Sequence, residues 1–381
     1  MKRMPSLTLI GALLLAVLLV AVVTVGCGTA AQSSGQAQAG PTTPQGVLQQ
    51  ALANTGQVTG GTGDIGVSVT VTGDQTKMPS GAQALLGQPI KLSGTYAFDR
   101  TAKAAQASLN AAIAGQSLPV GFEAVNGQAW LQFMGQWHQT PTSTDKALDT
   151  TTTGQESKAA SIQQALTAAG VDPSTWLTDV KAVGDETING TSTSHLSASV
   201  NVSQMASDVA KLVSSGALKS VIPSGAQEST ESTTPGASTS ETVSPQQEAQ
   251  QLQSELTSAL QSLSLDVWVT KDTNEIRQVE VKANIVPPAP STQNESATSE
   301  STATTESAAQ AQTRAALQSV IQGIKSVAID ATVTLVPATT PLTVTPPADA
   351  KLWSDLQTAL QEYMSLLSGV LGGGSTSTSA Q

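Results

Sequence analysis

The chain has few of the residues that carry out most enzyme and metal chemistry. Its 381 residues include one cysteine, Cys27, and two histidines, His138 and His195. A single thiol cannot form an intrachain disulfide, and it cannot supply a thiolate cluster for zinc. The scarcity therefore excludes a disulfide framework and a cysteine–histidine metal site. It predicts a fold that depends on a packed core.

Charged and aromatic side chains are also scarce. Charged residues make up 12% of the chain and aromatic residues 3%, and the formal net charge is -11. Because nucleic acid binding requires a basic stripe that faces the phosphates, this composition excludes a nucleic acid partner. With few bulky rings, the interior must be filled by small and aliphatic side chains.

Recognisable catalytic motifs are missing as well. The sequence contains no GxSxG, P-loop, HExxH or paired CxxC pattern. Neither His138 nor His195 has a visible partner, and we expect both rings to be exposed to solvent. Asp172 before Pro173 predicts a helix start whose carboxylate accepts first-turn amides. We therefore predict that the protein is not an enzyme and carries no cofactor or metal.

One long apolar run is present near the N terminus, over residues 7–25. Basic residues precede it and Gly26 and Cys27 follow it, which gives the basic start, apolar middle and small-residue cleavage site of a secretory signal. The layout resembles a bacterial lipoprotein signal, although Thr24 stands where such signals prefer Leu, Val or Ile. The resemblance implies that residues 1–26 are a signal peptide and that the sulfur of Cys27 receives a diacylglyceryl group.

An uncleaved signal anchor is the alternative interpretation of this run, because about 19 apolar residues can cross a bilayer. If Cys27 is modified instead, the anchor consists of palmitate-length acyl chains. Their burial, at ~0.8 kcal/mol per methylene, exceeds what stable anchoring requires. Both interpretations place the rest of the chain outside the cytoplasm, anchored to the cell membrane.

Several segments are rich in Ser, Thr, Gly and Pro and lack the apolar surface that would offset the entropy of ordering them. We interpret residues 27–45 as a flexible tether and residues 371–381 as a disordered tail. Residues 223–246 and 287–310 are predicted to be disordered insertions at loop tips. The rest of the chain, over residues 46–370, is predicted to be a single domain.

Within this domain, apolar and polar residues alternate with a period of two. Ile65, Val67, Val69 and Val71 share one face, and small polar residues share the other. The same pattern returns in residues 89–99, 102–113, 193–202, 276–285 and 326–336. Hairpin turns carrying Asn or Gly separate many of these stretches, which predicts about 11 strands in antiparallel succession.

Helical periodicity is limited to a few segments. These segments are residues 45–56, 156–170, 173–180, 203–216, 245–263 and 349–370. An antiparallel sheet with one apolar face must cover that face, and these helices are the available cover. The predicted fold class is therefore α+β, a strongly curved antiparallel half-barrel of about 11 strands covered by α-helices.

Several longer stretches resemble, in the order in which they occur, the LolA-like lipoproteins. This family includes the actinobacterial LppX and LprAFG lipid carriers. The stretches are VNGQAWLQFMGQWHQT (125–140), VDPSTWLTDVKAVGDETINGTSTSHLSASVNVSQMASDV (171–209), LDVWVTKDTNEIRQVEVKA (265–283) and TPPADAKLWSDL (345–356). The resemblance implies a half-barrel closed by helices around an apolar cavity that receives acyl chains. The two insertions and the alanine-rich stretch 102–113 depart from the family pattern.

The inner face of this sheet is either an ordinary packed core or a ligand cavity. Alanines in the stretch 102–113 leave volume above the sheet unless a helix approaches closely, and an apolar void accepts hydrophobic guests. If a cavity exists, its lining is expected to come from the apolar faces of the strands. The expected lining residues are Leu92, Tyr96, Phe98, Leu109, Ile113, Leu131, Phe133, Val267, Val279 and Val281.

The sequence thus supports one leading hypothesis, a monomeric envelope lipoprotein that binds or carries lipid, or another acylated molecule, by burial alone. A non-enzymatic envelope sensor or protein-interaction module on the same fold is the first alternative. A surface spacer, suggested by the Ser/Thr-rich insertions, is the second.

Overall fold

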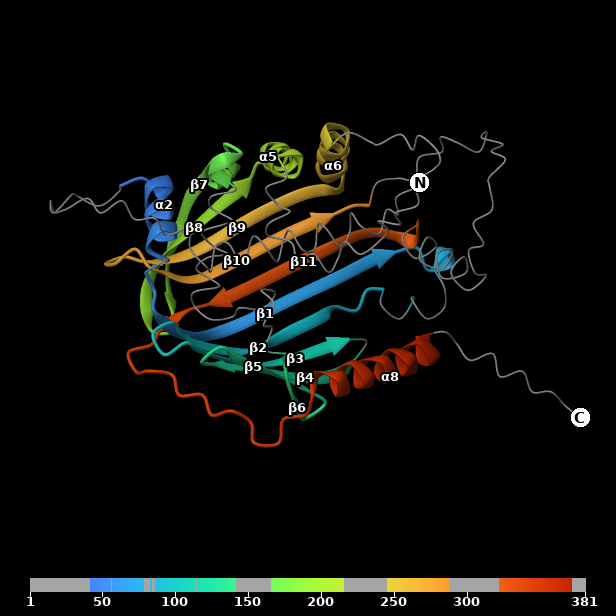
Figure 1. Cartoon of the computed structure of the whole chain (residues 1–381). Helices are drawn as coiled ribbons and strands as arrows, with labels where there is room; N and C mark the ends of the chain where they lie inside the picture. The colour runs from blue at the N-terminus through green and yellow to red at the C-terminus, as the bar shows by residue number, and fades with distance from the viewer. Residues whose placement is uncertain are drawn as a thin grey trace, which may run out of the picture.

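The alternating stretches of the sequence form one antiparallel sheet (Figure 1). The structure is a computed structural model that describes residues 42–55, 57–78, 83, 86–113, 115–141, 166–215, 245–287 and 322–371. The predicted signal peptide and Cys27 lie outside the described residues. So do most of the tether, both insertions and the tail, apart from positions at their margins.

The sheet has 12 strands, and its main path runs β6-β5-β4-β3-β2-β1-β11-β10-β9-β8-β7, with β12 paired to β1. The strands of the first half are β1 (Gly60–Gly73), β2 (Ile90–Asp99), β3 (Ala104–Ile113), β4 (Gln116–Val125), β5 (Gln128–Phe133) and β6 (Gln136–Gln139). The others are β7 (Leu177–Ile188), β8 (Thr191–Val200), β9 (Leu260–Thr270), β10 (Ile276–Ile285), β11 (Ile324–Thr334) and β12 (Val336–Pro337). The two end strands, β6 and β7, do not pair with each other, so the sheet is open.

Helices cover the two ends of the sheet. The helices are α2 (Pro44–Thr55), α5 (Val202–Ser214), α6 (Pro245–Ala259) and α8 (Trp353–Leu371), with short 3-10 turns η1 (Gln75–Lys77) and η2 (Pro173–Trp176). Helix α2 contacts β7, β9 and β10, while α5 and α6 pack on each other and on β9. Helix α8 lies at the opposite end, against β6 (Figure 1). The predicted fold class, a half-barrel with helical cover, is confirmed.

The hairpins turn where the sequence places Asn before Gly. Asn126 and Gly127 join β4 to β5, and Asn189 and Gly190 join β7 to β8. All four residues have positive φ, from 49° to 82°. Two-residue hairpins of type I′ need this left-handed conformation at both central positions, and Asn and Gly adopt it at the lowest cost.

The strand registers place the alternating apolar residues on a single face, here called the apolar face. Val67 of β1 lies opposite Leu92 of β2 on one side and Ala331 of β11 on the other. Ala331 in turn faces Val281 of β10, which faces Leu265 of β9. Since side chains on a strand alternate with a period of two, these pairings extend one apolar face from β2 to β9.

Two glycines permit a close approach of neighbouring strands. A Cβ at Gly63 of β1 would clash with the carbonyl oxygen of Thr334, and a Cβ at Gly94 of β2 would clash with that of Ser108. Both glycines lie on the apolar face by register. Neighbouring strands approach there more closely than a side chain at either position would allow, so both positions require glycine.

Two predicted helices end earlier than the periodicity suggests. The segment 173–180 is helical only to Trp176, and β7 begins at Leu177. The segment 245–263 is helical to Ala259, and β9 begins at Leu260. In both places, cross-strand pairing of alternating apolar residues overrides a sequence that also suits a helix. The predicted helix 156–170 falls mostly outside the described residues.

The helices of the described ranges are too short or too polar to cross a lipid bilayer.

Candidate functional site

The apolar face is divided into two parts that differ in burial. Over β8 to β11 it forms the main hydrophobic core beneath α2, α5 and α6. Leu265 at its centre is 1% exposed, and Leu48 of α2 and Met205 of α5 pack into the same cluster. The predicted lining residues Val267, Val279 and Val281 lie within this cluster.

The same face over β1 to β5 is only partly covered. Its large apolar side chains are half-buried, and we call this region the half-buried surface. It consists of Val67, Leu92, Tyr96, Phe98, Ala107, Leu109, Ala111, Leu118, Val120, Phe122 and Leu131. Cross-strand pairs such as Leu92 with Ala111, and Ala111 with Leu118, make it continuous. The alanines of β3 have short side chains, so the centre of this surface projects less from the sheet than its surroundings.

The predicted lining residues thus share one face but not one environment. Leu92, Tyr96, Phe98, Leu109 and Leu131 belong to the half-buried surface, whereas the three valines above belong to the core. The last two predicted lining residues lie at the borders of the half-buried surface. Ile113 ends β3 and is 37% exposed, and Phe133 is buried against the ring of Tyr363 of α8, edge to face, with ring centroids 5.8 Å apart. A cavity on this face stays a prediction.

Tyr96 is the polar exception on the half-buried surface. Its hydroxyl donates a hydrogen bond to the carbonyl oxygen of Thr334, at 2.7 Å. Burial, together with the nearby negative charge of Asp64, raises the pKa of Tyr96 to about 12. The hydroxyl therefore remains protonated and acts only as a structural donor across β1.

The prediction that His138 is exposed to solvent is wrong. The residue is 3% exposed, it belongs to the apolar face by its pairing with Leu131, and its Nδ1 lies 3.3 Å from the carbonyl oxygen of Leu352. The segment before α8 explains this burial. The backbone of Lys351 bonds to both Trp137 and Gln139 and so covers the free edge of β6.

The same prediction is wrong for His195, which is mostly buried: only 14% of its side chain is exposed. It lies on the polar face and stacks on Trp268, with ring centroids 4.2 Å apart. Its Nδ1 is 2.9 Å from Glu186 and its Nε2 is 3.0 Å from Asp266, while Trp268 Nε1 donates to Glu186 at 2.9 Å. His195 of β8 and its partners, from β7 and β9, span three strands, so only the register could have revealed the cluster. Among the described residues, no His, Cys, Asp or Glu cluster has the arrangement of a metal site.

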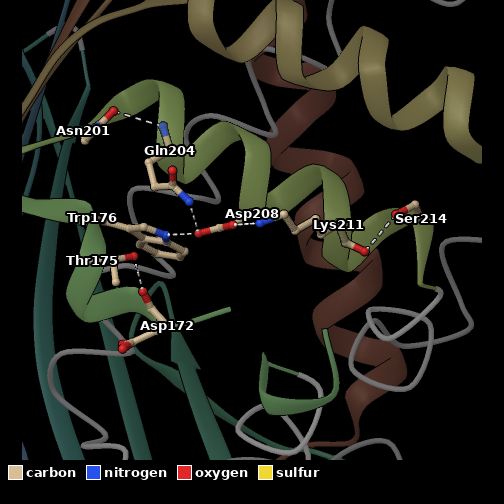
Figure 2. A network of polar contacts seen from close by, with 8 residues as sticks. All are labelled: Asp172, Thr175, Trp176, Asn201, Gln204, Asp208, Lys211 and Ser214. Carbon is tan, nitrogen blue, oxygen red and sulfur yellow. Dashed lines mark hydrogen bonds and ion pairs between the residues drawn. The ribbon is translucent and has the colours of Figure 1, made fainter. Parts of the chain in front are cut away.

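A buried carboxylate fixes the helical cover to the sheet (Figure 2). Asp208 of α5 is 2% exposed and accepts hydrogen bonds from Trp176 Nε1 at 2.8 Å, Gln204 Nε2 at 3.1 Å and Lys211 Nζ at 2.7 Å. Trp176 ends η2, which Asp172 begins by accepting the amide of Ser174 at 2.9 Å. The predicted role of Asp172 as a helix start is confirmed. The network therefore joins α5 to the start of β7.

The surroundings of Asp208 also set its protonation. Burial favours the neutral acid, but the hydrogen bonds from Lys211, Trp176 and Gln204 outweigh burial and hold the pKa of Asp208 below its ordinary value. A carboxyl whose pKa is lower in the folded state contributes stability above its unfolded-state pKa. That contribution is lost as the pH falls through the folded-state value.

We expect Asp208→Ala to lower the free energy of unfolding by about 1.5–3 kcal/mol at neutral pH, because a charged acceptor is lost and the half-buried indole N–H of Trp176 is left unpaired. Denaturant unfolding checks this value. The control, Asp272→Ala in an exposed turn, should change it by less than about 0.5 kcal/mol. In acid the free energies of unfolding of the two variants should converge. An Asp208→Ala variant as stable as the parent at neutral pH would rule out this role.

Comparisons with known proteins find matches in structure only. No family model and no curated protein matches the chain. Solved structures do. The chain is similar to the lipoprotein LppX of Mycobacterium tuberculosis, at 12% identity over 79% of this chain and 98% of that chain, with a TM-score of 0.30. LprF of Mycobacterium bovis matches at 11% identity over 80% and 97%, also with a TM-score of 0.30.

A DUF1329 family protein of Desulfovibrio piger matches at 7% identity, over 78% of this chain and 92% of that chain, with a TM-score of 0.19. LppX and LprF carry names of the group that the sequence stretches resemble.

Proposed function

We propose that this chain is an envelope lipoprotein that binds or carries acyl chains on the half-buried surface of β1 to β5. The observation that supports the proposal is the contrast within one continuous apolar face. The part under α2, α5 and α6 is closed by side chains, while the adjoining part retains half-buried Leu, Val and Phe side chains around a low strip of alanines.

Burial alone can provide the binding energy. Each methylene that moves from water onto such a surface contributes about 0.8 kcal/mol, so a chain of eight methylenes would gain roughly 6 kcal/mol before ordering costs. The surface is wide enough to follow an extended chain across several strands, since it runs from β1 to β5. No bond needs to form or break, and we propose binding or transfer without catalysis.

The N-terminal segment supplies the second half of the proposal. A diacylglyceryl group on Cys27 would hold the domain at the cell membrane, on its extracytoplasmic side, where acylated molecules are available. One chain with one such surface would act as a monomer. An envelope sensor or protein-interaction module remains the alternative, and it predicts the same anchor with no bound lipid.

Mass spectrometry of the full chain purified from a bacterial host tests both halves. Denaturing spectra should show loss of residues 1–26 and a diacylglyceryl group on Cys27. Native spectra should show an additional lipid mass that denaturation releases. The Cys27→Ser variant should lose the covalent mass and keep the released lipid. Native and denaturing masses that agree would contradict lipid carriage and favour the alternative module.

A further inference from the structure

A cavity of about 570 Å³ lies on the opposite, polar face of the sheet, over β1 to β6. Its volume is within the range of about 300–1,000 Å³ that is typical of small-molecule sites. Gly121 of β4 lines the cavity and has no side chain to fill it. A Cβ on Gly121 would lie 2.9 Å from the ring of Trp137 and from the side chain of Gln132, so these two side chains stand directly against the glycine.

The lining of this cavity is uncharged except for two carboxyl groups. Amides of Gln106, Gln132 and Asn189 border it, together with hydroxyl groups and the carboxyl groups of Asp64 and Glu123. No Lys, Arg or His is among the residues that line it. A phosphate or carboxylate ligand would therefore find no positive partner. Amides both donate and accept hydrogen bonds, a combination that suits a ligand rich in hydroxyl groups.

One carboxyl oxygen of Glu123 lacks a hydrogen-bond donor. Its Oε2 is buried and has no hydrogen-bond partner in the structure, and burial raises the pKa of its carboxyl group. A buried acceptor without a partner destabilises the fold, so such a group requires an explanation. A hydroxyl group of a ligand in the adjoining cavity would supply the missing donor.

Trp137 adds an apolar wall to this polar cavity. Sugar rings carry hydroxyl groups on their edges and C–H groups on their faces, and the flat face of an indole packs against such C–H groups. A site with one aromatic ring, several amides and one unpaired carboxylate oxygen matches both features of a sugar.

From this geometry we propose that the polar-face cavity binds a neutral saccharide, which packs on Trp137 and donates a hydroxyl hydrogen bond to Glu123. The amides of Gln106 and Gln132 complete its recognition. The polar side chains of this site lie by register on the face opposite the proposed acyl-chain surface, and three residues of that surface, Tyr96, Ala107 and Phe122, also border the cavity. Either one can fail in experiment without the other.

Binding of neutral glycans to the full chain tests the site. The full chain is first applied to an array of neutral glycans, and the strongest glycan is then titrated by tryptophan fluorescence. Choline chloride and glucose 6-phosphate serve as cationic and anionic probes. We expect saturable binding of a neutral glycan and none of the charged probes. Absence of neutral-glycan binding, or preferential binding of choline, would overturn the proposal.

Variants of the cavity separate recognition from folding. Glu123→Gln removes the buried charge, so at neutral pH it should raise the melting temperature, yet it should weaken glycan binding at least fivefold. Gln106→Ala, at an exposed position, should weaken binding at least threefold. The control Ser93→Ala lies on the same face of β2 outside the cavity and should change neither quantity. Unchanged affinity in Glu123→Gln would contradict the assignment.

Discussion

Ala111→Trp is expected to abolish most lipid binding, with at least a tenfold loss of the lipid that native mass spectra detect. Ala111 lies at the low centre of the half-buried surface, between Leu92 of β2 and Leu118 of β4. An indole ring at this position would occupy the space that an acyl chain needs. Because the site is only half-buried, the ring can be accommodated with little strain on the core.

The next residue of the same strand provides a matched control. Ala112 pairs with Lys91 and Ser117 on the polar face, so Ala112→Trp introduces the same ring on the opposite side of β3. This variant should keep its lipid. Full lipid content in both variants would exclude the half-buried surface as the binding site. Equal loss of lipid in both would indicate a general disturbance of the strand.

Leu265→Ala is expected to be the most destabilising single truncation on the apolar face. Leu265 is fully buried beneath the helices, and removal of a buried leucine side chain costs about 2–5 kcal/mol through lost burial and the cavity left behind. Urea unfolding, monitored by tryptophan fluorescence, gives the free energy of unfolding.

Leu92→Ala makes the same truncation on the same face, in its half-buried part. Because Leu92 keeps contact with water in the folded state, its loss should cost only about 1 kcal/mol, while lipid content should fall. The two leucines should therefore affect different quantities. If Leu92→Ala destabilises the fold as much as Leu265→Ala, the division of the face into core and binding surface is wrong.

The sequence predicted the faces of the strands well, for a physical reason. Alternation with a period of two is a local property, and Ile65, Val67, Val69 and Val71 all lie on the apolar face by register. Hairpin turns at Asn126 and Asn189 were equally accessible, because the positive φ they require is a preference of single residues. Together these local signals lead to an antiparallel sheet.

The different burial of residues on one face could not be predicted in this way. Val281 and Leu92 belong to the same alternating pattern, yet Val281 lies in the core and Leu92 in the half-buried surface. What separates them is the placement of α2, α5 and α6, which depends on contacts between distant segments. Local periodicity holds no information about such contacts.

Polar clusters were missed for a related reason. His195 meets Trp268 and Glu186 only because β8 lies between β7 and β9, and Asp208 meets Trp176 only because α5 packs on η2. The sequence contains no sign that Glu123 is buried, since an isolated acidic residue in a strand is normally interpreted as solvated. These sites emerge from strand order and helix packing.

Photolabelling tests the central claim, that acyl chains bind on the half-buried surface, most directly. The full chain is incubated with a diazirine-bearing fatty acid and irradiated, and the labelled residues are located by peptide mass spectrometry. We predict labels on apolar-face residues of β2 to β4, chiefly Leu92, Leu109 and Leu118, with competition by unlabelled fatty acid. Labels confined to the polar face, or labelling that unlabelled fatty acid does not reduce, would contradict the claim.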